Sequence, residues 1–452
     1  MPTLQLDFDL DEPGASEQGA REKSSFSDPA FAANKNLPVH RWVPWIAGFA
    51  SDFVGEAIQR YVPEGGVVLD PFSGVGTTLV EALVRGKQPI GFEINPYAAL
   101  AIRVKVDAYR VELAAFRAAI GEFCAFYSAH EADGYQPHST PPSGFKGRAE
   151  FYSDAVLRKV LILQDFITTL PEGELQDLFR IAFAATMVRY SNYSYEPSLG
   201  RRASAGKPDI LDWNVAQTVL GKLQEMGQDI AWLQQRVAPN AAPGRVVHDS
   251  FFNYERYLEP CTVDLAITSP PYLNNYHYNR NTRPQLYWLG YVEKPKDFHE
   301  LEQANFGKYW QTVREIDCVA LEVDLPNSDL AEKIEALRGI KQERGIYGGN
   351  GWANYAAAYF NDCRKLAQGL RHALRPSGIA LVVIGNSILQ GVMIPTDRYF
   401  SEIAEAEGLE LVEIHTPRAT RVGNSIIQSD VRVEAAQTHH KLYEAIVELK
   451  MR

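Results

Sequence analysis

The sequence predicts an α/β fold built on a doubly wound sheet that carries a large, mostly helical insertion. The first observation is local. An apolar run at Val67–Leu69 leads through Asp70 into the glycine-containing loop Pro71–Gly76 and a helix, and a second apolar run at Ile90–Phe92 ends in Glu93. This order of strand, glycine loop, helix, strand and acid opens a Rossmann-like nucleotide-binding sheet. The second observation is the long stretch that separates this unit from the next strand-like run.

Each element of this unit has its own signal. The segment from Ser51 to Tyr61 is predicted to be a helix, because its apolar residues recur at helical spacing and Ser51 or Asp52 can cap its start. The next helix is predicted at Thr77–Val84, with Gly86 as a stop signal beyond its end. Glu93 lies about 20 residues past the first strand, where a ribose-binding carboxylate is expected.

The loop Pro71–Gly76 indicates the kind of ligand. It is neither a Walker A loop, which would carry Gly-Lys-Ser/Thr, nor a GxGxxG dinucleotide loop, so the sequence does not favour a pyrophosphate. A carboxylate at Asp70 suits a ligand with a cationic group better. A glycine-rich loop alone is weak evidence and can be a plain structural turn. The flanking strands, the helix and the acid make a nucleotide-like ligand the favoured interpretation.

Two long insertions interrupt the predicted core. The stretch before Asp249 is far longer than one crossover helix needs, and one apolar stripe in it has regular helical spacing. That stripe consists of Val215, Val219, Leu223, Met226, Ile230 and Leu233. The predicted organisation is a polar arm at 1–35, core segments at 36–105, 246–278 and 351–452, a helical insertion at 106–245 and a second insertion at 279–350.

Composition bounds the functional class. The chain has 452 residues, of which 46% are hydrophobic, so it can bury a sizeable core. Its four cysteines show no paired spacing, which favours a reducing, cytoplasmic setting without structural zinc or disulfides. The acidic start lacks the features of a signal peptide, and no run is long enough to span a membrane. The net charge of −11 counts against a nucleic-acid partner, unless a local basic groove sits on an acidic body.

The stretch "ITSPPYLNNYHYNR", Ile267 to Arg280, follows a strand-like apolar run. It combines a serine, two prolines and a set of rings at Tyr272, Tyr276, His277 and Tyr278. Taken alone, "SPPY" is equally well a plain type I or polyproline turn. Beside a nucleotide-type loop, a rigid turn that presents a hydroxyl and an aromatic ring favours a catalytic role.

These two motifs carry a family resemblance. "DPFSGVGTT" resembles the S-adenosylmethionine loop of DNA amino-methyltransferases, and "TSPPY" resembles their catalytic motif. The pair covers the methyltransferase core, about half of the chain. The resemblance implies a class I methyltransferase fold, S-adenosylmethionine as cofactor and double-stranded DNA as partner, with neither a membrane nor a structural metal. A cognate restriction or defence subunit would be a separate chain.

The resemblance also implies roles for particular residues. Glu93 would bind the ribose hydroxyls, and Asp249 in "VVHDSFF" would contact the adenine. "NLPVHRWVPWIAGF" resembles the segment that closes over the methionine end of the cofactor. The cofactor-binding residues implied in this way are Asp70, Pro71, Phe72, Ser73, Gly74, Gly76, Thr77, Thr78, Glu93, Asn95, Asp249, Ser250, Thr268, His40 and Trp42, with Arg41 and Phe49 as further neighbours. "LRPSGIALVVIGNSILQG" and "HHKLYEAIVELK" resemble two late strands of the family, the second antiparallel.

The chemistry explains the catalytic motif. An exocyclic base amine is a poor nucleophile, because its lone pair is delocalised into the ring. In the family, the serine hydroxyl and the following carbonyl accept the amine hydrogens, which here implies Ser269 and the carbonyl of Pro270. Pro270 and Pro271 would hold these acceptors in place, and the Tyr272 ring would stack on the extruded base.

Serine at the first motif position is associated in the family mostly with cytosine N4 methylation, which is the preferred prediction. Adenine N6 methylation is the alternative. An RNA guanine-N2 methyltransferase and an inactive cofactor-binding protein are the rival classes. Target recognition would lie in the helical insertion, in the second insertion, or in both. The stretch "RYSNYSYEPSLGRRASAGKP" mixes tyrosines at 190, 193 and 195 with basic residues, which suits a DNA contact surface as well as a solvated loop.

Overall fold

In a computed structural model of the chain, the described residues are 26, 29, 31–45, 48–132, 134–145, 147, 150–195, 198–274, 278–308, 310–418 and 442–452. Most of the polar arm predicted at 1–35, together with Tyr276 and His277, lies outside them. Within this described part of the chain, no helix combines the length and the apolar character needed to cross a lipid bilayer.

The described residues form one large sheet of seven strands, in the order β10-β11-β7-β6-β1-β2-β5. Its strands are β1 (Val67–Asp70), β2 (Gln88–Phe92), β5 (Arg245–Val247), β6 (Val263–Thr268), β7 (Leu374–Gly385), β10 (Leu409–Arg418) and β11 (Glu444–Met451). β11 is antiparallel to both of its neighbours, and the remaining pairs are parallel. The doubly wound α/β prediction and the predicted antiparallel strand near the end of the sequence are therefore confirmed.

The position of β6 beside β1 creates the switch point of the sheet. The chain passes from β1 outward to β2 and β5, and then returns to place β6 on the other side of β1. In such sheets, ligands bind outside the carboxyl ends of the strands at this point. The carboxyl ends of β1, β2, β5 and β6 bring together Asp70, Glu93, Asp249 and Ser269 at one edge.

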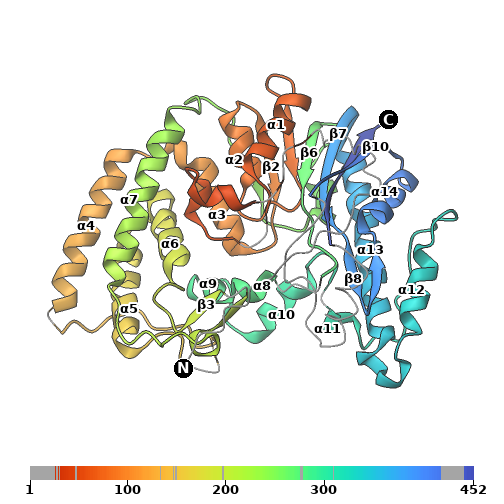
Figure 1. Cartoon of the computed structure of the whole chain (residues 1–452). Helices are drawn as coiled ribbons and strands as arrows, with labels where there is room; N and C mark the ends of the chain where they lie inside the picture. The colour runs from red at the N-terminus through yellow and green to blue at the C-terminus, as the bar shows by residue number, and fades with distance from the viewer. Residues whose placement is uncertain are drawn as a thin grey trace, which may run out of the picture.

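Helices cover both faces of the sheet (Figure 1). Successive side chains of a strand point to opposite faces of the sheet, so neighbouring residues of one strand pack against different helix layers. Val68 and Leu265 belong to the hydrophobic cluster beneath α1 (Ser51–Tyr61). Leu69 and Ala266 belong to a second cluster with α13 (Gly349–Ala373) and α14 (Thr396–Ala406). The helix predicted at 51–61 is confirmed.

Two helices connect the first strands. The loop after β1 leads into α2 (Thr77–Val84), which has the bounds that the sequence predicted. β2 is followed by α3 (Pro96–Asp107), whose start is capped by Asn95: the side-chain oxygen accepts the N–H groups of Tyr97 and Ala98. Such caps satisfy backbone donors that have no partner inside the helix.

The first insertion is mostly helical, and it packs on α2 and α3. Its elements are η3 (Ala108–Arg110), α4 (Leu113–Ala132), α5 (Asp154–Thr169), α6 (Glu174–Thr186), the hairpin β3 (Tyr193–Tyr195) and β4 (Leu199–Arg201), η4 (Arg202–Ala205) and α7 (Val215–Gln234). All six residues of the predicted apolar stripe are buried on α7. One hydrophobic cluster runs from α2 and α3 into α4–α7, so the insertion extends the core (Figure 1).

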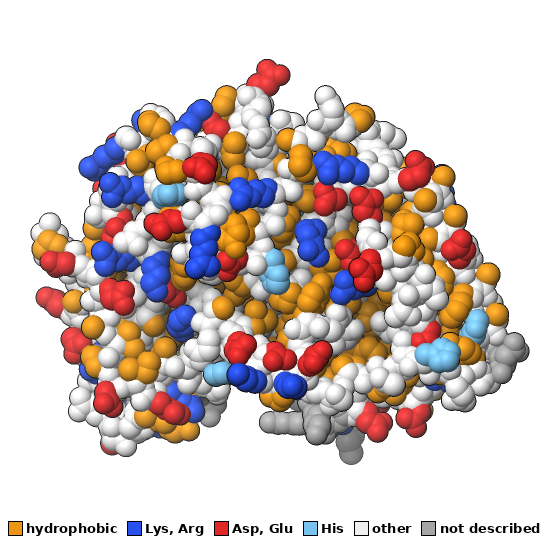
Figure 2. All heavy atoms as spheres, turned by 180° about the vertical axis from the view of Figure 1, so that it is seen from behind, with side chains coloured by type: hydrophobic (Ala, Val, Ile, Leu, Met, Phe, Trp, Pro, Cys, Tyr) orange, Lys and Arg blue, Asp and Glu red, His pale blue; other side chains and the backbone are white. Residues whose placement is uncertain are grey.

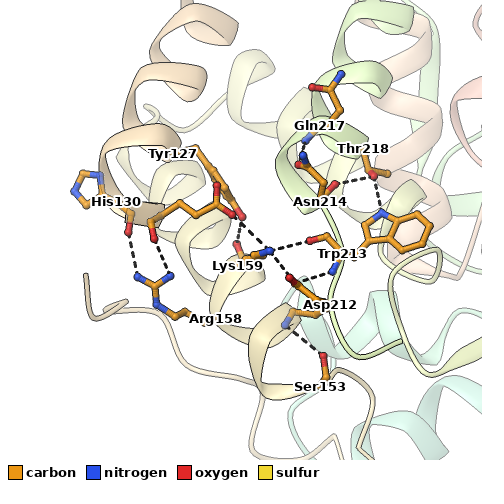
Figure 3. Close-up of polar contacts among 12 residues, drawn as sticks. Tyr127, His130, Ser153, Arg158, Lys159, Asp212, Trp213, Asn214, Gln217 and Thr218 are labelled. Carbon is orange, nitrogen blue, oxygen red and sulfur yellow. Dashed lines mark hydrogen bonds and ion pairs between the residues drawn. The ribbon is translucent and has the colours of Figure 1, made fainter. Parts of the chain in front are cut away.

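Polar contacts hold the segment that precedes α7 against α5, as Figure 3 shows. Ser153 donates to the carbonyl of Leu211 (2.8 Å), and Lys159 Nζ lies 2.7 Å from Asp212 Oδ1 and 3.3 Å from the carbonyl of Trp213. Asn214 then caps α7 through the N–H of Gln217 (2.9 Å). These contacts fix how the chain enters α7.

The second insertion consists of short helices between β6 and α13. They are α8 (Tyr278–Asn281), α9 (Arg283–Trp288), α10 (Pro295–Gln303), α11 (Trp310–Val313), α12 (Leu330–Arg338) and η6 (Gln342–Tyr347). A small hairpin, β8 (Ser387–Leu389) and β9 (Val392–Ile394), follows β7. The remaining short helices are η1 (Phe31–Asn36), η2 (His40–Trp42) and η5 (Phe251–Arg256).

Candidate active site

The loop between β1 and α2 is held in a tight curve. Gly74 and Gly76 have positive φ angles of 53° and 83°, which glycine adopts without strain. The N–H of Gly74 donates to Glu93 Oε2 (2.9 Å), so the loop lies against the end of β2. A Cβ atom on Gly74 would lie 3.1 Å from the Trp45 indole nitrogen. The loop is thus confined between β2 and the N-terminal segment.

Asp70 forms the hub of this corner of the sheet. Its Oδ1 accepts hydrogen bonds from the N–H of Phe72 (3.1 Å) and the hydroxyl of Thr268 (2.9 Å), and its Oδ2 accepts one from Thr78 (2.7 Å). Burial raises the pKa of Asp70 to about 6, against the effect of these hydrogen bonds. The carboxylate of Asp70 therefore joins β1 to α2 through Thr78 and to β6 through Thr268. In this structure, the polar groups of these three side chains are hydrogen-bonded to one another.

The other loop residues that the sequence singled out also have internal partners. The Ser73 hydroxyl donates to the carbonyl of Asp70 (2.9 Å), and Thr77 Oγ1 lies 3.4 Å from the Asn34 side-chain nitrogen. Pro71 is buried, whereas Phe72 and Gly74 are half-buried. The part of the loop that remains accessible to a ligand is therefore its middle.

Lys105 supports the loop from beneath, and no sequence signal had singled it out. It lies on α3, is 1% exposed, and donates from Nζ to the carbonyl of Val75 (2.9 Å). Burial lowers the pKa of this lysine to about 7, with a further contribution from Lys222. A cation in the apolar pattern "AIRVKV" is the signal that could have found it, because lysine is rarely buried without a specific partner.

Glu93 stands at the end of β2, facing the loop. Its Oε2 accepts the N–H of Gly74, and its Oε1 accepts the N–H of Asn95 (2.8 Å). Burial raises the pKa of Glu93 to about 7, and the nearby Asp70 carboxylate also raises it, although the backbone hydrogen bonds lower it. Each carboxylate oxygen keeps a second lone pair, so the side chain can still accept two ligand hydroxyls.

Asn95, by contrast, has no spare hydrogen-bonding capacity. Its oxygen caps α3, and its nitrogen donates to Asn279 Oδ1 (3.2 Å) and Thr282 Oγ1 (2.8 Å). An amide offers two acceptor and two donor positions, and all four are used. The implied cofactor contact of Asn95 stays a prediction; in this structure its side chain joins α3 to the segment that follows Ser269–Tyr272.

Asp249 follows β5 at the same edge. Its carboxylate accepts hydrogen bonds from the Tyr257 hydroxyl (2.8 Å), the Asn253 amide (2.9 Å) and the N–H of Ser250 (2.7 Å). Partial burial acts to raise the pKa of Asp249, but these hydrogen bonds outweigh it and the pKa lies below its usual value. Ser250 caps η5 through the N–H of Phe252 (3.3 Å). Asp249 is thus held ionised and in a fixed orientation.

Aromatic rings line the space beside these acids. Phe72 contacts Phe251 and Phe306 edge to face, with ring centroids 6.5 and 5.1 Å apart. Phe306 also lies 6.0 Å from Phe252. Phe306 comes from the second insertion and was missed by the sequence analysis, because no local pattern relates it to the loop. The site therefore combines two carboxylates with apolar rings, which fits an adenosine group.

The catalytic motif emerges from β6, directly beside β1. Ser269 is half-buried, Pro270 is buried and Pro271 is half-buried. The Tyr272 hydroxyl donates to Glu444 Oε1 (2.6 Å), at the start of β11, and lies 3.4 Å from Ser269 Oγ. Glu444 was missed by the sequence analysis, and its position 172 residues away leaves no local signal. Its hydrogen bond to the hydroxyl fixes the position of the Tyr272 ring.

Two residues of the N-terminal segment, His40 and Trp42, have internal partners, and their implied cofactor contact stays a prediction. Trp42 is fully buried, and its indole N–H donates to Asp229 Oδ2 on α7 (2.9 Å). His40 is 4% exposed and pairs with Glu81 of α2 (2.8 Å). Both rings are held by partners inside the protein, and Trp45 of the same segment lies against Gly74 of the glycine loop. Phe49 belongs to the cluster beneath α1.

The tyrosine-rich stretch of the first insertion is only partly exposed. Tyr190 is fully buried and stacks on Tyr152, with ring centroids 5.8 Å apart, so it is not a contact residue as expected. Tyr193 and Tyr195 are half-buried. On the face shown in Figure 2, basic and acidic side chains are interspersed. On this face, the two signs of charge are not separated into a single basic patch.

No group of three or more His, Cys, Asp or Glu side chains with metal-binding geometry occurs among the residues that the structure describes. The site offers carboxylates, a glycine loop, aromatic rings and a serine hydroxyl. These groups suit the binding of a neutral or cationic nucleoside and the orientation of an amine.

Comparison with known proteins agrees with this chemistry. A DNA methylase family model (N6_N4_Mtase) matches residues 33–103. The chain is 25% identical over 436 residues to the type II methyltransferase M.BsoBI of Geobacillus stearothermophilus, covering 88% of this chain and 83% of that protein. It is 23% identical over 371 residues to M.MvaI of Kocuria varians, covering 79% and 78%. It is 22% identical over 412 residues to M.AvaI of Anabaena variabilis, covering 85% and 82%.

The family match covers the N-terminal segment, the glycine loop and Glu93, and the relatives align over most of the chain. The sheet order places the Ser-Pro-Pro-Tyr motif on the strand next to that loop. The glycine loop, the two acids and the Ser-Pro-Pro-Tyr motif therefore all support methyl transfer. The chain is similar to DNA amino-methyltransferases, and this similarity implies S-adenosylmethionine as the methyl donor.

Proposed function

We propose that this protein is a site-specific DNA methyltransferase that methylates the exocyclic N4 amine of a flipped cytosine, in a restriction–modification or phage-defence setting. The observation that carries the proposal is the position of Ser269–Tyr272 at the carboxyl end of β6, next to the loop that follows β1. The relatives named above are type II methyltransferases, which supports the restriction–modification setting.

The residues that would hold S-adenosylmethionine are the middle of the loop, Glu93 and Asp249, with Phe72 beside them. When bound, the cofactor supplies an electrophilic methyl group on a sulfonium. Glu93 would accept the two ribose hydroxyls, and the ionised Asp249 would accept from the adenine amine. Charge-assisted hydrogen bonds of this kind are stronger than neutral ones.

The catalytic motif would orient the target amine. Ser269 Oγ and the carbonyl of Pro270 accept its two hydrogens, which turns the nitrogen lone pair toward the methyl group. Pro270 and Pro271 fix both acceptors before reaction. Tyr272, held by Glu444, would stack on the base. Bringing amine and methyl into line is a proximity effect that can lower the barrier by several kcal/mol.

Serine at the first motif position favours cytosine over adenine. We expect DNA from cells that express the protein to contain N4-methylcytosine, because serine in this position goes mostly with cytosine in the family. Nucleoside mass spectrometry of digested DNA measures this directly. DNA from cells that express a Ser269→Ala variant is the matched control. N6-methyladenine as the only new nucleoside would replace this proposal by the adenine alternative.

Cofactor binding is expected to depend on the ionisation of Glu93. Because burial raises its pKa to about 7, roughly nine-tenths of these side chains are protonated at pH 6 and roughly one-tenth at pH 8. The ionised form is the better acceptor for the ribose hydroxyls, so affinity rises with pH. We expect calorimetry to show about tenfold weaker S-adenosylmethionine binding at pH 6 than at pH 8.

The control for this pH dependence is Glu93→Gln, which keeps the shape but does not titrate. Its cofactor affinity should be lower than that of the wild type at pH 8 and change little with pH. An equally steep pH dependence in Glu93→Gln would assign the effect to another group, such as Asp70 or Lys105.

A further inference from the structure

A cavity of about 360 Å³ lies between the N-terminal segment, the first insertion and the short helices α8 and α9. Its size is within the range of ligand-binding pockets, roughly 300–1,000 Å³. Trp45 lines the cavity and also contacts Gly74 of the cofactor loop. Tyr278 lines the cavity and also a smaller pocket formed by Pro271 and Tyr272. The cavity is therefore adjacent to both halves of the active site.

The cavity is nevertheless distinct from that site. Its described lining contains neither the acceptors Ser269 and Pro270 nor the carboxylates Glu93 and Asp249. A ligand in it would therefore be neither the methylated base nor the nucleoside part of the cofactor.

Two residues of the lining carry a buried polar atom that has no partner among the described residues. These atoms are the hydroxyl of Tyr97, a residue that is 1% exposed, and Oε1 of Gln285, which is 2% exposed. Burying such groups without a partner costs free energy, about 1–3 kcal/mol each. Native proteins rarely leave them so, which makes a missing ligand the natural partner. One atom offers a donor or acceptor and the other an acceptor, as a base edge requires.

The charged side chains of the lining are basic, and no Asp or Glu is among its described residues. Three of the five basic groups are compensated from neighbouring elements: His40 by Glu81 on α2, Arg41 by Asp229 on α7, and Lys222 by Glu225 on α7.

Lys35 and Arg189 differ from these three. Both are exposed, and within the described residues neither has an ion pair or a side-chain hydrogen bond. Two positive charges at one cavity that are not paired with a described carboxylate would favour the binding of an anion there.

Aromatic rings complete the lining. Trp45, Tyr97, Tyr195 and Tyr278 all contribute. Tyr195 is fixed in place, because its hydroxyl donates to the carbonyl of Asn281 (3.0 Å) and lies 3.3 Å from Gln285 Nε2. Cations combined with aromatic faces are the composition that binds unpaired nucleotides.

We propose that this cavity binds a nucleotide of the DNA substrate other than the one that is methylated. Tyr97 and Gln285 contact its base, and Lys35 and Arg189 contact its phosphate. The proposal rests on the proposed function, since it takes DNA as the substrate. It assigns part of target recognition to the junction of the two insertions.

The sharpest test is Tyr97→Phe, which removes only the unpartnered hydroxyl. Folding should not suffer, because no bond within the protein is lost. We expect affinity for a duplex that the wild type methylates to fall on the order of three- to tenfold, the effect of one hydrogen bond. Cofactor affinity should be unchanged. Fluorescence anisotropy with labelled DNA and calorimetry with the cofactor measure the two affinities.

Tyr359→Phe is the matched control. The Tyr359 hydroxyl is also buried and without a partner, but it lies on α13 outside the cavity. Its removal should leave DNA affinity unchanged. Equal DNA affinity for Tyr97→Phe and the wild type would overturn the proposal, and so would a loss confined to cofactor binding, which would make the cavity part of the cofactor site.

The phosphate contact has its own readout. Arg189→Ala and Lys35→Ala should each weaken DNA binding and reduce the slope of log affinity against log salt by about one. Arg117→Ala, an exposed arginine on α4, is the control and should leave the slope unchanged. Unchanged slopes for both cavity variants would contradict the phosphate contact. A wild-type protein that binds and methylates no DNA would instead overturn the proposed function itself, and this inference with it.

Discussion

Replacing Asp229 by Ala is expected to lower the free energy of unfolding by about 3 kcal/mol. Removing one partner of a buried ion pair typically costs about 3–5 kcal/mol, and the partial exposure of Arg41, 27%, places this case at the lower end. Asp229 accepts four hydrogen bonds, one each from the N–H of Val39 and the indole of Trp42 and two from the Arg41 guanidinium. Without the carboxylate these donors are left unpaired beside a buried ring.

The matched control is Glu225→Ala. Glu225 lies one helical turn before Asp229 on α7 and is also near Arg41 (3.9 Å), but it is 30% exposed. Exposed ion pairs contribute about 0–1 kcal/mol. Urea unfolding of the two variants and the wild type measures the difference. A loss of under about 1 kcal/mol for Asp229→Ala, equal to that of Glu225→Ala, would show that the N-terminal segment is not held by this carboxylate.

The central part of the fold could be predicted from local sequence. The unit β1–loop–α2–β2 combines a buried strand, glycines with positive φ and an amphipathic helix, and each of these leaves a pattern within a few residues. The apolar stripe of α7 is equally local. The resemblance then predicted a catalytic role for the Ser-Pro-Pro-Tyr motif after β6, and the sheet order places that motif beside the loop.

The direction of individual side chains could not be predicted in this way. Trp42 and His40 were assigned to the cofactor because their segment resembles one that closes over it. In the structure, Trp42 points to Asp229 on α7, a helix of the insertion that the core resemblance does not include. The resemblance also implied a cofactor contact for Asn95, but in the structure its amide is used by α3 and by Asn279. Residues that are adjacent in sequence lie close together, but their side chains can point in different directions.

One of the missed residues did leave a signal. Asp229 lies three residues after Met226 and four before Leu233, so it falls on the apolar stripe of α7. A carboxylate on an apolar face is almost never buried without a partner, which predicts a buried cation or a set of donors opposite it. Glu444 left no such signal, because its partner Tyr272 is reached only through the pairing of β11 with β7.

Replacing Tyr272 by Ala is expected to slow methyl transfer by roughly tenfold to over a hundredfold, while cofactor affinity stays nearly unchanged. The ring follows the acceptors Ser269 and Pro270 and lies outside the cofactor loop, so its loss affects the base. Stacking on a base contributes about 1–3 kcal/mol, which gives this range of rates if it acts only in the transition state. Single-turnover methylation, alongside cofactor titration, measures both quantities.

Tyr272→Phe and Glu444→Gln separate stacking from the anchoring of the ring. In Tyr272→Phe the aromatic face remains and the hydroxyl contacts with Glu444 (2.6 Å) and Ser269 (3.4 Å) are lost, so the rate should fall far less than in Tyr272→Ala. Glu444→Gln keeps an acceptor at the same position but removes its charge, and its effect should not exceed that of Tyr272→Phe. Equal losses for Phe and Ala would mean that the hydroxyl, held by Glu444, matters and stacking does not. A wild-type rate in Tyr272→Ala would remove this ring from the reaction.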